Sequence, residues 1–92
     1  MSPPTKETIE RKMKETLGAA HVEIVDESWK HAGHAGAASG GHFILRVVSK
    51  QFEGVPLLDR NRMVFQALRE EMGRGIHALA ISALTPEEWN GR

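Results

Sequence analysis

The chain contains no cysteine among its 92 residues. Disulfides are therefore excluded, and so are thiolate metal sites and cysteine nucleophiles supplied by this chain alone. The chain also lacks an apolar run that approaches the roughly 20 residues a membrane span needs. Its first residues lack the apolar stretch of a secretory signal. We therefore expect a cytoplasmic protein that does not bind a membrane.

The chain also has no net charge, because its twelve basic and twelve acidic residues cancel. A neutral molecule has no overall field that would draw it onto nucleic acid. Any DNA binding would have to come from a local basic patch. A chain of 92 residues is long enough to form one hydrophobic core but not two, so we expect a single domain over residues 1–92.

Hydrophobic periodicity predicts the secondary structure. Apolar residues spaced four apart predict helices, and short runs rich in β-branched residues predict strands. The predicted elements are a helix at Lys6–Leu17, strands at His21–Ser28 and His42–Ser49, a helix at Asp59–Met72 with Asp59 as its cap, a strand at Ile76–Leu84 and a short terminal helix announced by Thr85-Pro86-Glu87-Glu88.

Glycine dominates the segment between the first two strands. Four glycines in residues 29–41 argue against a packed element, so we predict a mobile loop there within an ordered core of about 6–90. The first two strands then form an antiparallel pair, and the strand–helix–strand connection makes the third strand parallel to the second. The expected fold class is α+β: an α-β-β-α-β two-layer sandwich, with a three-stranded mixed sheet and helices on one face.

Five histidines accompany the absence of cysteine. His31 and His34 lie in the glycine-rich loop, and His77 begins the third predicted strand. Histidine is a common ligand of transition metals, so these three residues are candidate metal ligands. The alternatives are solvated loop residues and a hydrogen-bonded structural histidine. His21 and His42 are expected to be surface residues at strand ends.

A basic surface is the second candidate site. Arg60 and Arg62 give the second long helix a basic start, and Lys50 lies just before it. Such helices contact nucleic-acid backbones, although nearby acidic residues favour an ordinary solvated face. We find no acid–base pair of carboxylates, activated nucleophile or phosphate-binding glycine loop, so we expect no enzyme.

Taken in order, these segments resemble the BolA family over about residues 6–90. The resemblance is carried by Val22-Glu23-Ile24-Val25-Asp26-Glu27-Ser28, His42-Phe43, Phe52-Glu53-Gly54, Arg60-Asn61-Arg62-Met63-Val64, Ala67-Leu68-Arg69-Glu70-Glu71, Ile76-His77-Ala78-Leu79-Ala80-Ile81 and Thr85-Pro86-Glu87-Glu88-Trp89. The chain departs from the family at Asn61, where a histidine is usual.

The resemblance implies a fold similar to the type II KH domain, without the Gly-x-x-Gly loop that clamps nucleic acid. It also implies pairing with a monothiol glutaredoxin. The pair would share a 2Fe–2S cluster, held by a glutaredoxin cysteine, a glutathione thiol and side chains of this chain. The family's C-terminal histidine falls on His77. Its loop ligand falls on His31, with His34 as the competitor. No cluster is expected in the isolated chain.

Two functions follow from the resemblance. The first is a glutaredoxin-bound adaptor in iron–sulfur trafficking and iron regulation. The alternative is a KH-like, DNA-binding regulator of transcription of morphology and stress genes, which would use Lys50, Arg60 and Arg62. Neutral charge and the missing Gly-x-x-Gly loop favour the first. A homodimer remains open under either.

Overall fold

The computed structural model describes residues 5–27 and 41–91. They form, in order, α1 (Thr5–Leu17), β1 (His21–Asp26), β2 (Gly41–Val48), a single 3₁₀ turn (Lys50–Phe52), α2 (Leu57–Ala67), β3 (Ile76–Leu84) and α3 (Pro86–Asn90). This order confirms the α-β-β-α-β prediction, followed by the short terminal helix. The predicted loop at 29–41 lies outside the described residues except for Gly41, which belongs to β2.

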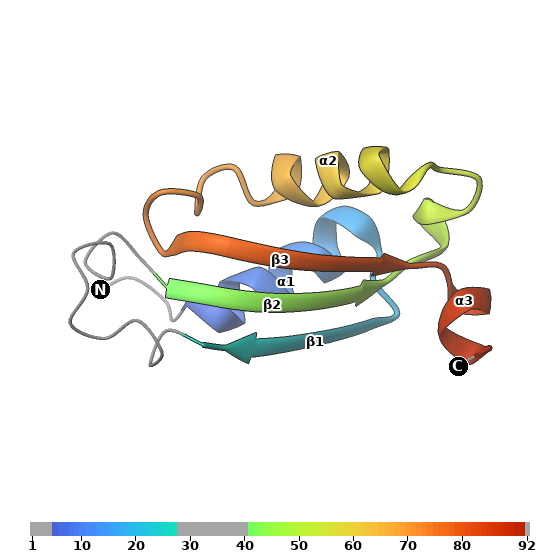
Figure 1. The fold of residues 1–92 in the computed structure, drawn as a ribbon, viewed down its shortest axis with the longest axis horizontal. Coiled ribbons are helices and arrows are strands. Elements are labelled where there is room, and N and C mark those ends of the chain that lie inside the picture. The colour runs from blue at the N-terminus through green and yellow to red at the C-terminus, as the bar shows by residue number, and fades with distance from the viewer. Residues whose placement is uncertain (1–4, 28–40, 92) are drawn as a thin grey trace.

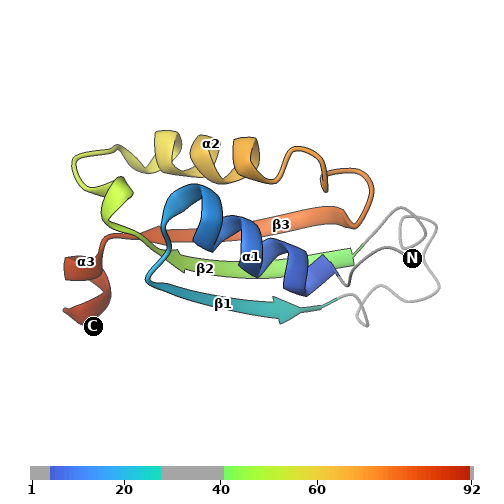
Figure 2. The ribbon, with the colours of Figure 1, turned by 180° about the vertical axis from the view of Figure 1, so that it is seen from behind.

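The three strands form one mixed sheet in the order β1-β2-β3. β1 is antiparallel to β2, with Ile24 opposite Leu45, and β2 is parallel to β3, with Leu45 opposite Ile81. Both relations were predicted. Figures 1 and 2 show α1 crossing one face of the sheet, with α2 beside it along β3 and α3 at one end of the strands. Among residues 5–27 and 41–91, no long helix covers the other face of the sheet, in agreement with the two-layer prediction.

The core lies between the sheet and the two long helices. α1 contributes a stripe at four-residue spacing, and alternate residues of β2 meet it from the sheet, as a helix period and a strand period require. The buried apolar residues of this core cluster are Ile9, Met13, Leu17, Phe43, Leu45, Val47, Phe52, Val64, Leu68, Ile76 and Ala83. Because Phe43, Leu45 and Val47 point into this core, the intervening β2 residues face the open side of the sheet.

The end of α1 and the 3₁₀ turn are tied together by Ser49. Gly18 has a φ of 58°, a left-handed conformation that favours glycine after a helix. The buried Ser49 hydroxyl donates to the carbonyl of Leu17 and accepts from the amide of Gln51. This places the start of β1 beside the end of β2.

The predicted limits of the second long helix were wrong at both ends. α2 begins at Leu57 after Pro56. Asp59 therefore lies in the first turn and is not the cap, although a carboxylate there still complements the helix dipole. After Ala67 the chain turns, and the amides of Glu71 and Met72 bond to the carbonyl of Leu68 at 2.9 and 3.1 Å.

The longer helix was suggested by an apolar stripe that continues past the true helix end. Leu68 is fully buried, and Met72 packs against the core, although both follow α2. Gly73, with a φ of 84°, then reverses the chain toward β3. Burial, and not helical geometry, accounts for the spacing of these two side chains.

Candidate functional site

His77 lies at the start of β3, where the pairing with β2 is irregular. Gly41 is opposite Ile76, but His42 is opposite Ala78, so His77 is an extra residue in β3. Such a bulge breaks the alternation of side chains along a strand. Ile76 is completely buried, and the next side chain, His77, is exposed. Because of the bulge, both Ile76 and Leu79 face the core, and His77 lies between them on the exposed side.

His42 meets His77 on the open side of the sheet. Their ring centroids are 5.1 Å apart, and the ring planes are inclined by 45°. The main chain of His42 is held from both sides. Its carbonyl accepts the amide of Glu27 at 2.7 Å, and its Cα pairs with that of Ala78. We call His42 and His77 the histidine pair.

A shallow groove of about 250 Å³ adjoins the histidine pair. It is lined by residues from all three strands or their ends: Glu27, His42, Phe43, Ile44, Ala78, Leu79 and Ala80. The alanines contribute little bulk above the sheet. Farther along the open face, Val25 and Ile44 leave 52% and 38% of their surface exposed. An incoming group could reach the two rings across this face.

The donor set fits a metal site that is completed from outside. Imidazole is a good ligand for iron, zinc and copper. Within residues 5–27 and 41–91, no group of three or more histidine, aspartate or glutamate side chains could hold a metal ion. Two imidazoles without a third described ligand suit a shared centre better than a closed structural one.

The predicted ligands His31 and His34 lie outside the described residues. The segment that contains them leaves β1 after Glu27 and returns at Gly41, next to His42. His42 itself was expected to be an ordinary surface residue. The signal that would have found it was present, because His42 and His77 begin two strands that were predicted to be parallel, and parallel strands begin at the same edge of a sheet.

The expectation that Arg60 belongs to a solvent-facing basic surface was wrong. Arg60 is only 7% exposed. Its guanidinium donates to the carbonyls of Val55 and Ala83, at 2.7 and 3.2 Å, and to Oε1 of Glu88 at 2.7 Å. These bonds fasten α2 to the end of β3 and to α3. Arg60 therefore has a structural role.

The remaining predicted basic residues are on the surface. Lys50 is exposed in the 3₁₀ turn. Arg62 is exposed on α2 and forms an ion pair with Asp59 at 3.2 Å. Without Arg60, the predicted patch is reduced to these two cations, one of which already has a carboxylate beside it.

The far end of the open face holds a second histidine in different surroundings. The His21 ring stacks on Trp89 of α3, with centroids 4.8 Å apart and planes inclined by 27°. The guanidinium carbon of Arg46 lies 5.7 Å from the Trp89 ring. The Glu23 carboxylate contacts both His21 and Arg46, at 2.8 Å from His21 Nε2 and 3.0 Å from the Arg46 guanidinium. The hydrogen bond from His21, together with the positive charge of Arg46, lowers the pKa of Glu23.

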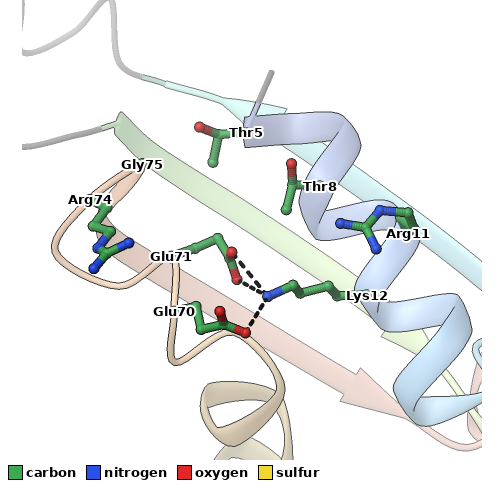
Figure 3. A pocket seen from close by; sticks show the side chains of 8 residues that line it. All are labelled: Thr5, Thr8, Arg11, Lys12, Glu70, Glu71, Arg74 and Gly75. Atoms are coloured by element: carbon green, nitrogen blue, oxygen red, sulfur yellow. Dashed lines mark hydrogen bonds and ion pairs between the residues drawn. The ribbon is translucent and has the colours of Figure 1, made fainter. Parts of the chain in front are cut away.

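A cavity lies on the helix side, between α1 and the turn before β3 (Figure 3). Its volume is about 740 Å³. Lys12 Nζ crosses it to reach both oxygens of Glu71, at 2.9 and 3.0 Å, and Glu70 at 3.3 Å. The bond to Glu71, followed by that to Glu70, raises the pKa of Lys12. Through these two carboxylates, Lys12 connects α1 to the turn that follows α2.

The fold is a small α+β domain with one open sheet face, on which the histidine pair lies. The family described as BolA-like protein matches residues 13–88. Relatives confirm this match. The DNA-binding transcriptional regulator BolA of Escherichia coli (strain K12) is 40% identical over 86 residues, which cover 94% of this chain and 80% of that protein. BolA-like protein 1 of Homo sapiens is 43% identical and is covered over 61% of its length.

Solved structures agree. The BolA domain of SufE1 from Arabidopsis thaliana matches with a TM-score of 0.80 and 38% identity, covering 96% of this chain and 99% of that one. BolA1 from Mus musculus matches with a TM-score of 0.79 and 41% identity, covering 98% and 72%. The chain belongs to the BolA-like family.

The chain is shorter than several of these relatives. It spans 51% of BOLA1, the chloroplastic protein of Arabidopsis thaliana, to which it is 43% identical. Over residues 5–27 and 41–91, no helix has the length and apolar character needed to cross a membrane.

Proposed function

We propose that this chain is an adaptor that pairs with a monothiol glutaredoxin and holds a shared 2Fe–2S cluster, in iron–sulfur trafficking and iron regulation. The observation that carries the proposal is the exposure of the His77 ring at a bulge on the open face, beside a second imidazole. A buried histidine at this position would have argued for a structural role.

The chemistry of the donor set supports the proposal. This chain has no thiol, so the sulfur ligands would come from the glutaredoxin and glutathione. Two imidazoles in place of two thiolates reduce the negative charge of such a cluster and raise its potential. Imidazole also competes with protons for the metal. These properties suit a site that transfers or senses a cluster, and reduced thiols place it in the cytoplasm.

The partner would approach the open face of the sheet. Val25 and Ile44 are apolar side chains exposed on that face, and Ile44 lines the groove beside the histidine pair. Burying them would contribute binding energy next to the shared metal. Ile44→Glu should therefore weaken the heterodimer, as measured by calorimetric titration. Leu57→Glu is the matched control, because Leu57 is 67% exposed but lies at the start of α2.

The decisive experiment is anaerobic reconstitution of the chain with a monothiol glutaredoxin, glutathione, iron and sulfide. We expect a heterodimer whose visible absorption and circular dichroism differ from those of the glutaredoxin alone. His77→Ala should abolish or strongly alter that spectrum while the chain remains folded. A folded His77→Ala complex with an unchanged spectrum and cluster lifetime would refute the assignment of His77.

DNA binding is the second candidate function. It is favoured by the similarity to the DNA-binding transcriptional regulator BolA of Escherichia coli. Because Arg60 is buried, the contact would have to use Lys50 and Arg62. Affinity should then fall steeply with salt, and Lys50→Ala/Arg62→Ala should weaken binding and reduce the salt dependence. An unchanged affinity would exclude these residues as the contact surface.

A further inference from the structure

The two outer edges of the sheet differ in how well they are protected against pairing with another chain. β1 is a strand of six residues, and Glu23 and Asp26 place charges on it. Short length and charged side chains are devices by which proteins keep an edge strand from accepting a further strand. β3 has nine residues and contains no aspartate, glutamate, lysine, arginine or proline. The edge formed by β3 is therefore the more receptive of the two.

Both ends of the β3 edge are closed by residues outside the sheet. At its start, the amide of Ile76 bonds to the carbonyl of Glu71 at 2.9 Å, and its carbonyl accepts the amide of Gly73 at 2.7 Å. At its end, the outward carbonyl of Ala83 accepts from Arg60 at 3.2 Å. These bonds leave only the middle of β3 open to a further strand.

The main chain in the middle of β3 has outward hydrogen-bonding groups. Main-chain N–H and C=O groups alternate in direction along a strand, so Leu79 and Ile81 direct theirs to the same side as Ala83. Within residues 5–27 and 41–91, no hydrogen bond is made to these outward groups of Leu79 and Ile81. Another strand is the structure that satisfies such a row of donors and acceptors.

One flank of α2 extends over this edge. Figures 1 and 2 both show α2 along the outer side of β3. Val64 of α2 is buried in the core, and Met63 and Ala67 line a groove together with residues of α1. At 3.6 residues per turn, Leu58 and Phe65 lie on the opposite flank, away from α1. Their side chains are 63% and 40% exposed, so an added strand would cover apolar surface that is now open.

We propose that the β3 edge and this flank of α2 form a docking site for an extended segment of a partner protein, which adds a fourth strand to the sheet. Its main chain bonds to Leu79 and Ile81, and its apolar side chains at every second position pack against Leu58 and Phe65. The main-chain bonds provide affinity, and the apolar flank selects the sequence. The site is separate from the open face proposed for the glutaredoxin and goes beyond that function.

The position of α2 favours a lone segment over a second copy of this chain. α2 contacts β3. If β3 of a second copy continued the sheet, the two α2 helices would lie over neighbouring strands, which are about 4.8 Å apart. Packed helices need about 8–10 Å between their axes. A segment that brings no helix of its own on this face avoids that clash.

The first test titrates the isolated chain with a capped peptide of alternating valine and threonine, with a lysine at each end for solubility. In amide NMR spectra, the signals of Leu79 and Ile81 should shift, and exchange of their amide hydrogens with solvent should slow, because both amides gain a partner. The fully N-methylated peptide keeps the side chains but cannot donate main-chain hydrogen bonds, so it should not bind. Equal binding of the two peptides would overturn the proposal.

Matched variants test the contribution of α2. Leu58→Glu and Phe65→Glu should each weaken binding of the valine–threonine peptide by about tenfold or more, the effect expected for a central apolar contact. Val25→Glu is the control, because Val25 is also exposed but lies on the open face. Unchanged affinity in both α2 variants, or a loss in Val25→Glu alone, would contradict the site.

Three further outcomes would refute it. Slowed exchange at Val22 and Ile24, in place of Leu79 and Ile81, would put the added strand on β1. Sedimentation without peptide should give a monomer, and a dimer that protects Leu79 and Ile81 would make a second copy the occupant. No change of either signal at about 1 mM peptide, where even a weak complex forms, would remove the site.

Discussion

The two ends of the open sheet face both carry histidine, but their neighbours differ in kind. The His21 ring is stacked on Trp89 and hydrogen-bonded to Glu23, so it already contacts an aromatic ring and a carboxylate of the same chain. His77 is exposed at a bulge beside His42, with a groove and two alanines next to them. The comparison separates a histidine that contacts an aromatic ring and a carboxylate from a pair that lies beside an open groove. It also predicts where substitutions should cost stability and where they should not.

The largest loss of stability is expected on substitution of Arg60. This residue holds α3 in place, and α3 carries Trp89 at one end of the sheet face. Arg60→Met removes three hydrogen bonds and leaves two backbone carbonyls without this donor. We expect the free energy of unfolding to fall by about 2–4 kcal/mol in urea denaturation. Arg62→Met is the control and should change it by less than about 0.5 kcal/mol. Equal effects would show that Arg60 does not anchor this end.

A smaller loss is expected at Trp89 itself. Trp89→Ala removes the stack on His21 and the contact with Arg46. Together these are worth about 1–2 kcal/mol. The visible spectrum of the reconstituted glutaredoxin complex should not change, because the histidine pair lies at the opposite end of the face. A changed spectrum would show that the two ends are coupled.

Low pH should weaken the interactions at the end of the sheet face that carries His21 and Trp89. The pKa of Glu23 is lowered chiefly by His21, and that of Glu88 chiefly by Arg60. A carboxylate with a lowered folded pKa contributes stability above the ordinary glutamate pKa of about 4.3, and that contribution is lost as the pH falls through the folded value. Glu23→Gln/Glu88→Gln should therefore flatten the fall in unfolding free energy below about pH 4.3. A double variant with the wild-type pH profile would contradict this assignment.

The smallest effect is expected at the open end. His42→Ala/His77→Ala should change the free energy of unfolding by no more than about 0.5 kcal/mol, the range of ordinary surface substitutions. Urea denaturation without metal measures this directly. A loss comparable to that of Trp89→Ala would mean that the histidine pair also has a structural role, and the contrast between the two ends would disappear.

Much of the fold could be predicted because local periodicity and topology agree. The spacing of Ile9, Met13 and Leu17 marks α1, and Gly18 after it has the left-handed φ that is typical of a helix C-cap. The parallel pairing of β2 and β3 followed from the handedness of a strand–helix–strand unit. The limits of β3 were predicted without error.

Features that depend on tertiary contacts could not be read in the same way. The buried role of Arg60 requires the carbonyl of Ala83 and the carboxylate of Glu88, which are distant in sequence. The length of α2 was overestimated because Leu68 and Met72 reach the core from turns. His42 was passed over because its importance comes from a neighbour on another strand.

The bulge at His77 also gives a sequence rule for this sheet. In an unbroken strand, buried residues would recur at every second position, but the buried Ile76 is followed by an inward-facing residue three positions later, at Leu79. The bulge thus divides β3 into two phases, each with an inward-facing residue. Deletion of Ala78 would restore a single phase, in which Ile76 and Leu79 face inward and His77 still faces outward, directly opposite His42. The extra residue therefore sets which β2 residue lies opposite the imidazole, and not the face of the sheet on which the ring lies.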